Sequence, residues 1–314
     1  MLNTLAIYMP VLHSLLKLAG MSPLSVEIEP GTIIHFWVPT ETSKTKTKTP
    51  SKPDKKPVKP VVVFLHPFGF DGILTWQFQV LALARKYAVY VPDFLFFGRS
   101  ITDRTERSAS FQAECMAKGL GKLGVEKCTL VGLSYGGMVG FKMAEMFPDL
   151  VHSLVVSCSV MALTESITRY GLERLGFSSW AELLLPDTVK GLKELIEIST
   201  HNFFRIPSFV CRHILEIMFD NRKERAELLE ALITPDKDFN IPNYPQKIHL
   251  LWGVNDKIFN MEVANNLKEQ LEGKVTLHCI ENAGHMVPIE RPWVYNRHLK
   301  KILASLYEKG NQES

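Results

Sequence analysis

The segment from Gly132 to Gly136 places a serine between two glycines, where a strand pattern passes into a helix pattern. Residues 128–131 form a short apolar run typical of a buried strand, and residues 138–147 have helical character. A turn this tight holds its central residue, Ser134, in a strained conformation, and side chains two positions before and after it would clash. The pattern therefore predicts a nucleophile elbow, with the Ser134 hydroxyl exposed at the edge of a sheet.

The five-residue pattern is weak evidence by itself. Gly-x-Ser-x-Gly occurs by chance in roughly one chain in ten of this length, and the alternative is a turn built from small residues. In an elbow, the helix N-terminus points at the serine, which suits attack on a carbonyl and stabilisation of the oxyanion that forms. The role of Ser134 therefore depends on a base, an acid and an oxyanion site elsewhere in the chain.

The composition is that of an ordinary globular protein. The 314 residues can form one large α/β domain or two smaller ones, and 46% hydrophobic residues are ample for a core. Seven lysines between residues 44 and 59 contribute to the net charge of +3, and no basic helix or basic–aromatic pattern indicates nucleic-acid binding. The five cysteines form no Cys-x-x-Cys or Cys/His cluster, so we expect no metal site, no disulfide framework and a reducing, cytoplasmic compartment.

Residues 1–24 are expected to form an N-terminal amphipathic helix. The stretch 2–18 is apolar, but it contains Pro10, His13 and Lys17 and lacks a basic start. It is also shorter than the roughly 20 residues that a membrane span needs. We expect the helix to pack on the body of the protein, and the alternative is a peripheral membrane contact through residues 2–18.

From residue 25 onward, strand and helix patterns alternate. Two strands joined by Pro30-Gly31 lead into a Lys/Thr/Pro-rich stretch, 40–60, which we interpret as a flexible surface loop at the N-terminal ends of the strands. The alternation predicts an α/β fold with a mostly parallel, doubly wound sheet. The core is expected in two parts, 25–158 and 246–308, with a tail at 309–314.

A helical cap is expected between the two parts of the core, at residues 159–245, because only helical periodicity is found from 160 to about 240. It should cover the C-terminal ends of the strands, where α/β sheets bind ligands. The apolar residues of the cap belong either to its own core or to a cavity wall, and the sequence does not separate these roles. They include Phe177, Trp180, Leu183, Leu184, Phe203, Phe204, Phe209 and Phe219.

A serine nucleophile needs a base that is oriented by a carboxylate. His285 lies in a short loop after the last predicted strand and can reach the elbow, although a turn histidine held by packing is the alternative. Asp256 follows the strand after the cap, where aspartates are also common as turn residues or helix caps. The order Ser134, Asp256, His285 is the one expected for this architecture, and Ser157-Cys158-Ser159, after an earlier strand, offers no competing carboxylate.

An oxyanion needs two preorganised N–H donors. Tyr135, the residue after the nucleophile, is expected to supply one. The other should come from residues 66–69, and because Pro67 has no N–H, Phe68 is the predicted donor. The alternative is that His66-Pro67 simply ends a strand. We interpret Asp93, after the next strand, as a structural residue of its loop.

Together, the elbow, residues 66–69, residues 93–100, Asp256 and residues 282–285 resemble the alpha/beta-hydrolase superfamily over about residues 25–308. Within it, the chain is similar to the monoacylglycerol lipase and epoxide-hydrolase-like branch, particularly its plant-type members. The resemblance implies hydrolysis of carboxylic esters through an acyl-enzyme, without cofactor or metal. Separately, the apolar residues of the cap favour a small-molecule ester with a hydrophobic acyl or aromatic portion. Two departures matter: Pro67 replaces a common glycine, and Ser134 replaces the elbow aspartate that epoxide hydrolases and haloalkane dehalogenases require.

Three other functions would use the same scaffold. The Ser134 site could transfer an acyl group to another alcohol or thiol, or serve a lyase of specialised metabolism, because membership of a superfamily does not fix function. A small-molecule receptor with slow or vestigial hydrolysis is the third.

Overall fold

A nine-stranded sheet forms the centre of the protein in the computed structural model, which describes residues 3–45, 59–202, 205–272 and 275–308. The strands run in the order β1-β2-β4-β3-β6-β7-β10-β11, with β5 paired to β2. All neighbours from β4 to β11 are parallel, whereas β2 is antiparallel to β1, β4 and β5. The prediction of a mostly parallel, doubly wound sheet is confirmed. The strands are β1 (Met21–Glu29), β2 (Thr32–Pro39), β3 (Val61–Leu65), β4 (Ala88–Pro92), β5 (Ile101–Thr102), β6 (Cys128–Leu133), β7 (Val151–Ser157), β10 (Lys247–Gly253) and β11 (Val275–Ile280).

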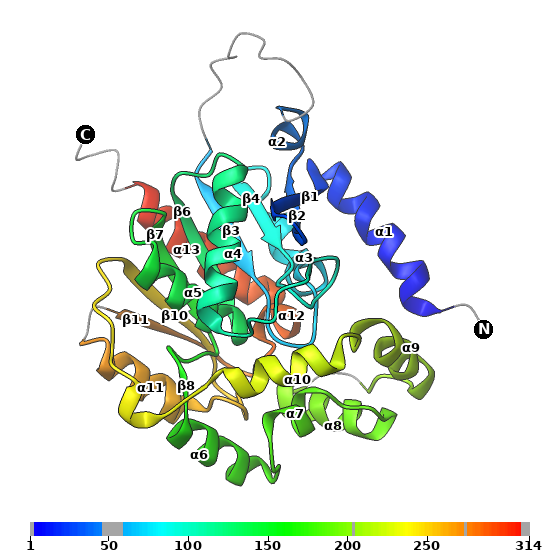
Figure 1. Cartoon of the computed structure of the whole chain (residues 1–314), viewed down its shortest axis with the longest axis vertical. Coiled ribbons are helices and arrows are strands. Elements are labelled where there is room, and N and C mark those ends of the chain that lie inside the picture. The colour runs from blue at the N-terminus through cyan, green and yellow to red at the C-terminus, as the bar shows by residue number, and fades with distance from the viewer. Residues whose placement is uncertain (1–2, 46–58, 203–204, 273–274, 309–314) are drawn as a thin grey trace.

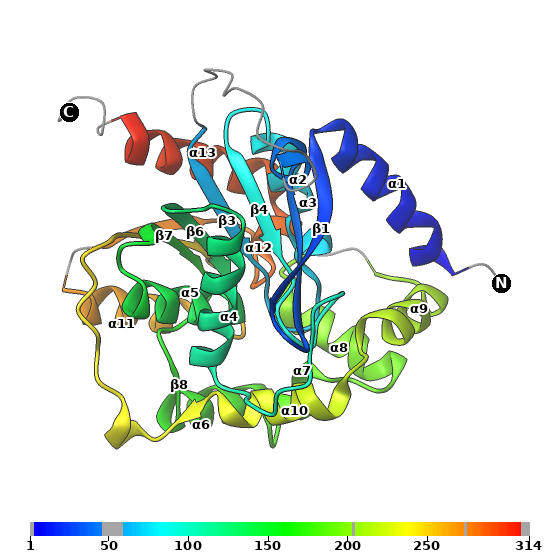
Figure 2. The same cartoon turned by 45° about the horizontal axis from the view of Figure 1, so that its top comes forward.

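Helices cover both faces of this sheet. On one face lie α4 (Ala109–Lys122) and α5 (Tyr135–Met146), and on the other lie α3 (Gly72–Leu83) and α13 (Pro292–Glu308), as Figures 1 and 2 show. The helix α11 (Met261–Gln270) packs beside β10 and β11, and the short α12 (Val287–Glu290) packs against α3. Because the central strands are buried on both faces, they are apolar along almost their whole length rather than alternating.

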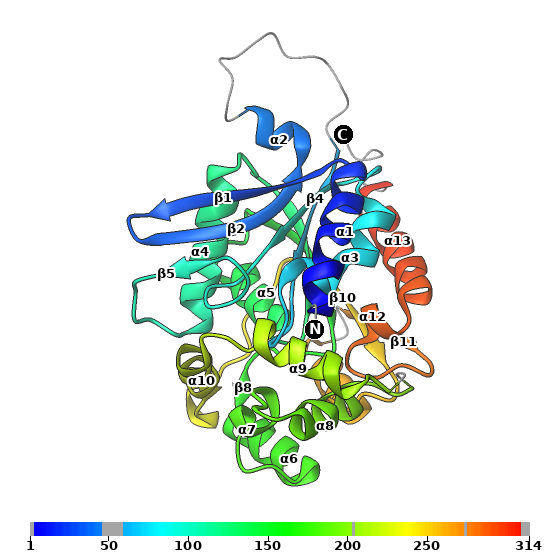
Figure 3. The same ribbon diagram turned by 90° about the vertical axis from the view of Figure 1, so that its right-hand side faces the viewer.

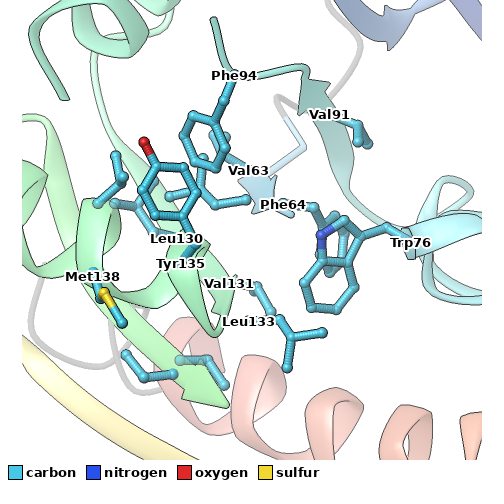
Figure 4. Close-up of a cluster of buried hydrophobic side chains, with 14 of the residues drawn as sticks. Val63, Phe64, Trp76, Val91, Phe94, Leu130, Val131, Leu133, Tyr135 and Met138 are labelled. Carbon is cyan, nitrogen blue, oxygen red and sulfur yellow. The ribbon is translucent and has the colours of Figure 1, made fainter. Parts of the chain in front are cut away.

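Aromatic side chains fill the core on both sides of β3 and β6. Trp76 of α3 packs on Phe64 of β3, with ring centroids 4.9 Å apart, and Tyr135 packs on Phe94 at 5.0 Å. Figure 4 shows these two pairs with the strand side chains of the same cluster. The second pair lies where the strands end, so the packed core continues directly into the candidate site.

The chain between β7 and β10 forms the helical insert, which lies beyond the C-terminal ends of the strands (Figure 1). The expected helical insertion is confirmed, but it is not all helical, because two short strands pair in parallel within it. Each has only two residues, which is too short for a periodic pattern. The insert contains β8 (Leu163–Thr164), α6 (Glu165–Leu175), α7 (Trp180–Leu184), α8 (Val189–Ser199), α9 (Ser208–Met218), α10 (Arg222–Ala231), β9 (Ile233–Thr234) and the 3-10 turn η1 (Asp236–Asp238).

Two further expectations need correction near the N-terminus. The strand β1 begins at Met21, so the expected boundary after residue 24 falls inside a strand. The start of the expected loop at 40–60 is a helix, α2 (Thr40–Thr45), with Glu41 in its first turn and Lys44 in its last, an arrangement that suits the helix dipole. This helix was not predicted because its residues are all polar and give no apolar periodicity. Residues 46–58, and the expected tail at 309–314, lie outside the described residues.

The N-terminal helix α1 (Thr4–Leu18) is capped by Asn3, whose side chain accepts hydrogen bonds from the backbone N–H groups of Leu5 and Ala6. Its buried residues are Leu12 and Leu16, and it lies beside β1, α3 and α9 (Figure 3). Within the part of the chain that the structure describes, no helix has the length and apolar character needed to cross a membrane.

Candidate active site

Ser134 lies between β6 and α5, with φ 53° and ψ −119°. A non-glycine residue in this region is strained. A Cβ atom at Gly136 would lie 2.2 Å from the carbonyl oxygen of Leu65, and one at Gly132 would lie 2.5 Å from that of Gly136. Both contacts are with backbone, so neither position has room for a side chain. The turn therefore has the geometry of a nucleophile elbow.

His285 and Asp256 lie together at the ends of β11 and β10. The Nδ1 atom of His285 is 2.9 Å from Oδ2 of Asp256, and both side chains are buried. The other carboxylate oxygen of Asp256 accepts hydrogen bonds from the backbone N–H groups of Ile258 (2.7 Å) and Phe259 (3.0 Å). Because Nδ1 donates to the carboxylate, Nε2 keeps its lone pair and is the atom able to accept a proton.

Ser134 and His285 both line one apolar cavity of about 230 Å³. Among the hydrogen bonds of the described residues, none joins the Ser134 hydroxyl to the His285 ring. In free enzymes such bonds are often long, and they tighten when substrate binds.

The cavity lies between the core and the insert. Of the apolar insert residues named from the sequence, Trp180, Leu184 and Phe219 line it. Phe177 and Leu183 pack elsewhere, and Phe209 is exposed on the surface. Phe203 and Phe204 lie outside the described residues. A further wall residue, Leu5, comes from α1. Its place on the wall was not foreseen, because an apolar helix does not reveal which cavity it covers.

The expected oxyanion donors also lie on this cavity. Phe68 and Tyr135 both line it, and their backbone N–H groups donate to no acceptor among the described residues. His66 fixes the loop that carries Phe68, because its Nε2 accepts from the N–H of Phe94 (2.9 Å) while Nδ1 donates to the carbonyl of Pro67 (2.8 Å). Burial lowers the pKa of His66 to about 3, so the ring is neutral, as these two bonds require.

A buried arginine of the insert supports the same loop. The guanidinium of Arg225, on α10, lies 4.3 Å from the centroid of the Phe97 ring, and its Nε donates to the carbonyl of Phe96 (2.8 Å). The Phe97 ring in turn meets that of Phe68 edge to face, at 5.1 Å. Arg225 therefore links the insert to the loop that carries an expected oxyanion donor.

A glutamate ties the loop of His285 to the insert. Glu290 accepts hydrogen bonds from the backbone N–H of Gly284 (2.7 Å) and, on the insert side, from those of His201 (2.8 Å) and Asn202 (2.6 Å). The roles of Glu290 and Arg225 could not be predicted, because each depends on contacts between segments that are distant in sequence.

Cys158 is a neighbour of the His285–Asp256 pair that was not predicted from the sequence. Its sulfur, a carboxylate oxygen of Asp256 and a ring nitrogen of His285 all lie within 4.8 Å of one another. Burial, and then the adjacent Asp256 carboxylate, raise the pKa of the Cys158 thiol well above its usual range. The thiol is therefore neutral and fills the place, after β7, where the sequence offers no acid.

Asp93 lies away from this cavity and holds two loops together. The two oxygens of its carboxyl group accept hydrogen bonds from the backbone N–H groups of Gly72 (2.9 Å) and Arg99 (3.2 Å). Burial, and then the nearby Asp71, raise the pKa of Asp93 to about 8. The structure thus places Asp93 in loop packing and not beside Ser134.

A strained serine after a parallel strand, a buried His–Asp pair on the same cavity and a helical insert over the strand ends together define the alpha/beta-hydrolase class. A comparison of sequences agrees with this. The model of the alpha/beta hydrolase fold family matches residues 60–292, and the chain belongs to that family.

Individual relatives are distant. Monoacylglycerol lipase abhd6-A of Xenopus laevis is 25% identical over 202 residues, which are 61% of this chain and 59% of the relative, so the match spans less than two thirds of that protein. Epoxide hydrolase 4 of Homo sapiens is 24% identical over 259 residues, 76% of this chain and 71% of that protein. Among solved structures, a membrane phospholipase A described as a bacterial virulence factor has a TM-score of 0.76 at 23% identity, covering 96% of this chain and 91% of that one. This likeness shows the fold alone.

Proposed function

We propose that the protein hydrolyses carboxylic esters through an acyl-enzyme on Ser134, with Asp256 and His285 completing a catalytic triad. The observation that carries this proposal is that Ser134, His285, Phe68 and Tyr135 line one cavity, and that the backbone N–H groups of Phe68 and Tyr135 have no acceptor among the described residues. These groups supply a nucleophile, a base and an oxyanion site, which are the parts that acyl transfer needs. No cofactor or metal enters this mechanism.

In the first half of the reaction, Oγ of Ser134 attacks the acyl carbonyl carbon while Nε2 of His285 takes the hydroxyl proton. The carboxylate of Asp256 keeps the imidazole in the required tautomer and stabilises its positive charge. The N–H groups of Phe68 and Tyr135 bind the oxyanion of the tetrahedral intermediate. His285 then protonates the leaving alkoxide, and the acyl-enzyme remains.

In the second half, water replaces the alcohol. Nε2 of His285 accepts a proton from the water as its oxygen attacks the acyl-enzyme, and the same proton returns to Oγ of Ser134 when the acid leaves.

The serine at the elbow also argues against epoxide hydrolysis, for which the relatives of this fold use an aspartate at that position. The similarity to epoxide hydrolase 4 is therefore one of scaffold.

The cavity supports an ester with an apolar acyl or aromatic portion. Its wall is made of side chains such as Trp180, Leu184, Phe219 and Met138, with few polar groups besides Ser134 and His285. Monoacylglycerols have the required ester and acyl chain, and the name of the Xenopus laevis relative supports them as the first substrates to test. The narrower assignment to plant-type members rests on the sequence resemblance alone.

The test is a panel of esters graded by acyl length and by alcohol size. The wild-type protein should turn over repeatedly, with kcat/KM rising as the acyl chain lengthens. Ser134→Ala should lower kcat by about 10⁴-fold or more, whereas Ser305→Ala, on α13, should leave it unchanged. A product that forms only with an added alcohol or thiol would identify an acyltransferase, bond cleavage without water a lyase, and tight binding without turnover a receptor.

A further inference from the structure

Exposed apolar side chains are concentrated on three neighbouring helices. Of the twelve large hydrophobic side chains that are exposed in the described part of the chain, eight belong to α1, α3 and α9. Figure 3 shows these three helices on one side of the molecule. Six of the eight form what we call the apolar face: Ile7, Val11, Leu15 and Leu18 of α1, with Phe209 and Ile217 of α9.

The apolar face is not needed to hold α1 in place. The helix is attached through its opposite side, where Leu12 and Leu16 are buried, and its first turn is tied to α9 by a hydrogen bond from the N–H of Thr4 to Nδ1 of His213 (3.1 Å). The four α1 residues of the apolar face recur at helical spacing and are 46% to 86% exposed. On α1 they form an exposed apolar stripe, and exposed apolar surface of this kind marks an interaction site.

The same two helices form part of the wall of the candidate active site. Leu5 of α1 lines the cavity that contains Ser134, as do Ile214 and Met218 of α9. Each helix therefore presents one side to the cavity and another to solvent. A partner bound to the apolar face would therefore lie next to the cavity that is proposed to hold the apolar part of the substrate.

The charges around the face favour an anionic surface. The helix α1 contains no Asp or Glu and carries Lys17 near its end. Exposed arginines lie at positions 205 and 212, beside and on α9. Glu216 is the single acid of that helix, and Asp220, just after it, is paired with Arg225. Anionic lipid headgroups attract such cations. With 15 residues, α1 is too short to span a bilayer but suits a position in the plane of its interface.

We propose that the apolar face inserts into the interfacial layer of a lipid bilayer, strengthened by anionic headgroups, and so holds the cavity wall of α1 and α9 against the lipid. The bilayer is then the source from which the ester enters. This last step rests on the proposed function, whereas the binding to lipid does not.

The test separates the two. In Ser134→Ala protein, which removes catalysis, sedimentation with vesicles of phosphatidylcholine alone, or with phosphatidylglycerol added, measures binding. We expect binding to both vesicles, stronger where phosphatidylglycerol is present. Val11→Glu/Leu15→Glu should weaken it at least about tenfold, because it places two charges in the layer that accepts the apolar face. The matched control, Ile101→Glu/Ile241→Glu, alters two side chains of similar exposure outside that face and should bind as before.

A second variant guards against a folding defect. Leu18→Glu changes the most exposed residue of the face and should also weaken binding while leaving the melting temperature unchanged. In protein with Ser134 intact, Val11→Glu/Leu15→Glu should hydrolyse a soluble short-chain ester as the wild type does and lose turnover of an ester embedded in vesicles.

Equal vesicle binding by Ser134→Ala protein with and without Val11→Glu/Leu15→Glu would overturn the proposal, as would Ser134→Ala protein that sediments with neither vesicle. A dimer that this double variant dissociates would identify a second copy of the chain as the occupant instead. If every vesicle-binding result is as expected but no ester is hydrolysed, the proposed function is wrong and the proposed lipid-binding surface is still supported.

Discussion

His285 and Asp256 meet because their loops leave neighbouring parallel strands in register. Gly253 at the end of β10 pairs with Ile280 at the end of β11, and the N–H of Asn255 donates to the carbonyl of Ala283 (2.9 Å). Backbone contacts alone therefore hold the two loops together, independently of the His285 and Asp256 side chains. The 2.9 Å contact between Nδ1 and Oδ2 is a consequence of sheet geometry as much as of side-chain attraction.

Gly136→Ala tests the elbow. The added Cβ would lie 2.2 Å from the backbone oxygen of Leu65, which cannot move without displacing β3. We expect the free energy of unfolding to fall by about 2–4 kcal/mol and ester hydrolysis to be lost. Gly121→Ala, in α4, has nothing within 4 Å of the new atom and should instead raise stability slightly, by about 0.5–1 kcal/mol. Chemical denaturation of both variants measures this, and equal stabilities would contradict it.

The pKa of Asp93 makes stability depend on pH. Burial and then Asp71 raise this pKa from 3.8 to about 8, so the folded protein holds a proton on Asp93 that the unfolded chain has released above pH 3.8. Protonated Asp93 therefore contributes its full stabilisation of the folded state below pH 3.8, and this contribution is lost as the pH rises toward 8 and beyond. A tenfold difference in proton affinity between the folded and unfolded chains corresponds to about 1.4 kcal/mol. In Asp93→Asn, the decline in unfolding free energy between pH 5 and 9 should be smaller than in the wild type, and an unchanged decline would assign it to other groups.

Arg225 is expected to act as a positioning residue for the oxyanion loop. Its Nη1 donates to the carbonyl of Met218 (2.5 Å) in addition to its contacts with Phe96 and Phe97. In Arg225→Met both carbonyls lose a buried donor, which should lower stability by about 2–3 kcal/mol. We also expect kcat for a compact ester to fall about tenfold while KM changes little, because an oxyanion contact forms only in the transition state. Arg225→Lys should recover part of kcat. A stability loss with unchanged kcat would leave Arg225 a purely structural role.

The segment 46–58 should be dispensable for catalysis. It connects α2 to the N-terminal end of β3, and both α2 and that end of β3 lie at the opposite end of the sheet from the insert (Figure 1). Replacing it with a shorter Gly/Ser linker should leave kcat/KM within about twofold, since surface connections tolerate changes in length. A large loss of activity in a variant whose circular dichroism spectrum is unchanged would contradict this placement.

The sheet was predictable because its strands are long, apolar runs, such as those of β3 and β6, that alternate with helical patterns. The elbow was predictable because the turn around Ser134 has no room for a side chain at Gly132 or Gly136, a requirement that is visible in the local sequence. The helix α2 was missed because its sequence, Thr-Glu-Thr-Ser-Lys-Thr, is polar on every side. Leu5, Glu290 and Cys158 were missed for a different reason, since their importance arises only when distant segments meet.

The most direct measurement is intact-protein mass spectrometry after exposure to a fluorophosphonate, which reacts with an activated serine hydroxyl. We predict one adduct per chain in the wild type, located on Ser134, absent in Ser134→Ala and formed much more slowly in Asp256→Asn. A wild-type protein that remains unlabelled, or a Ser134→Ala variant that is labelled as fast as the wild type, would contradict the proposed mechanism.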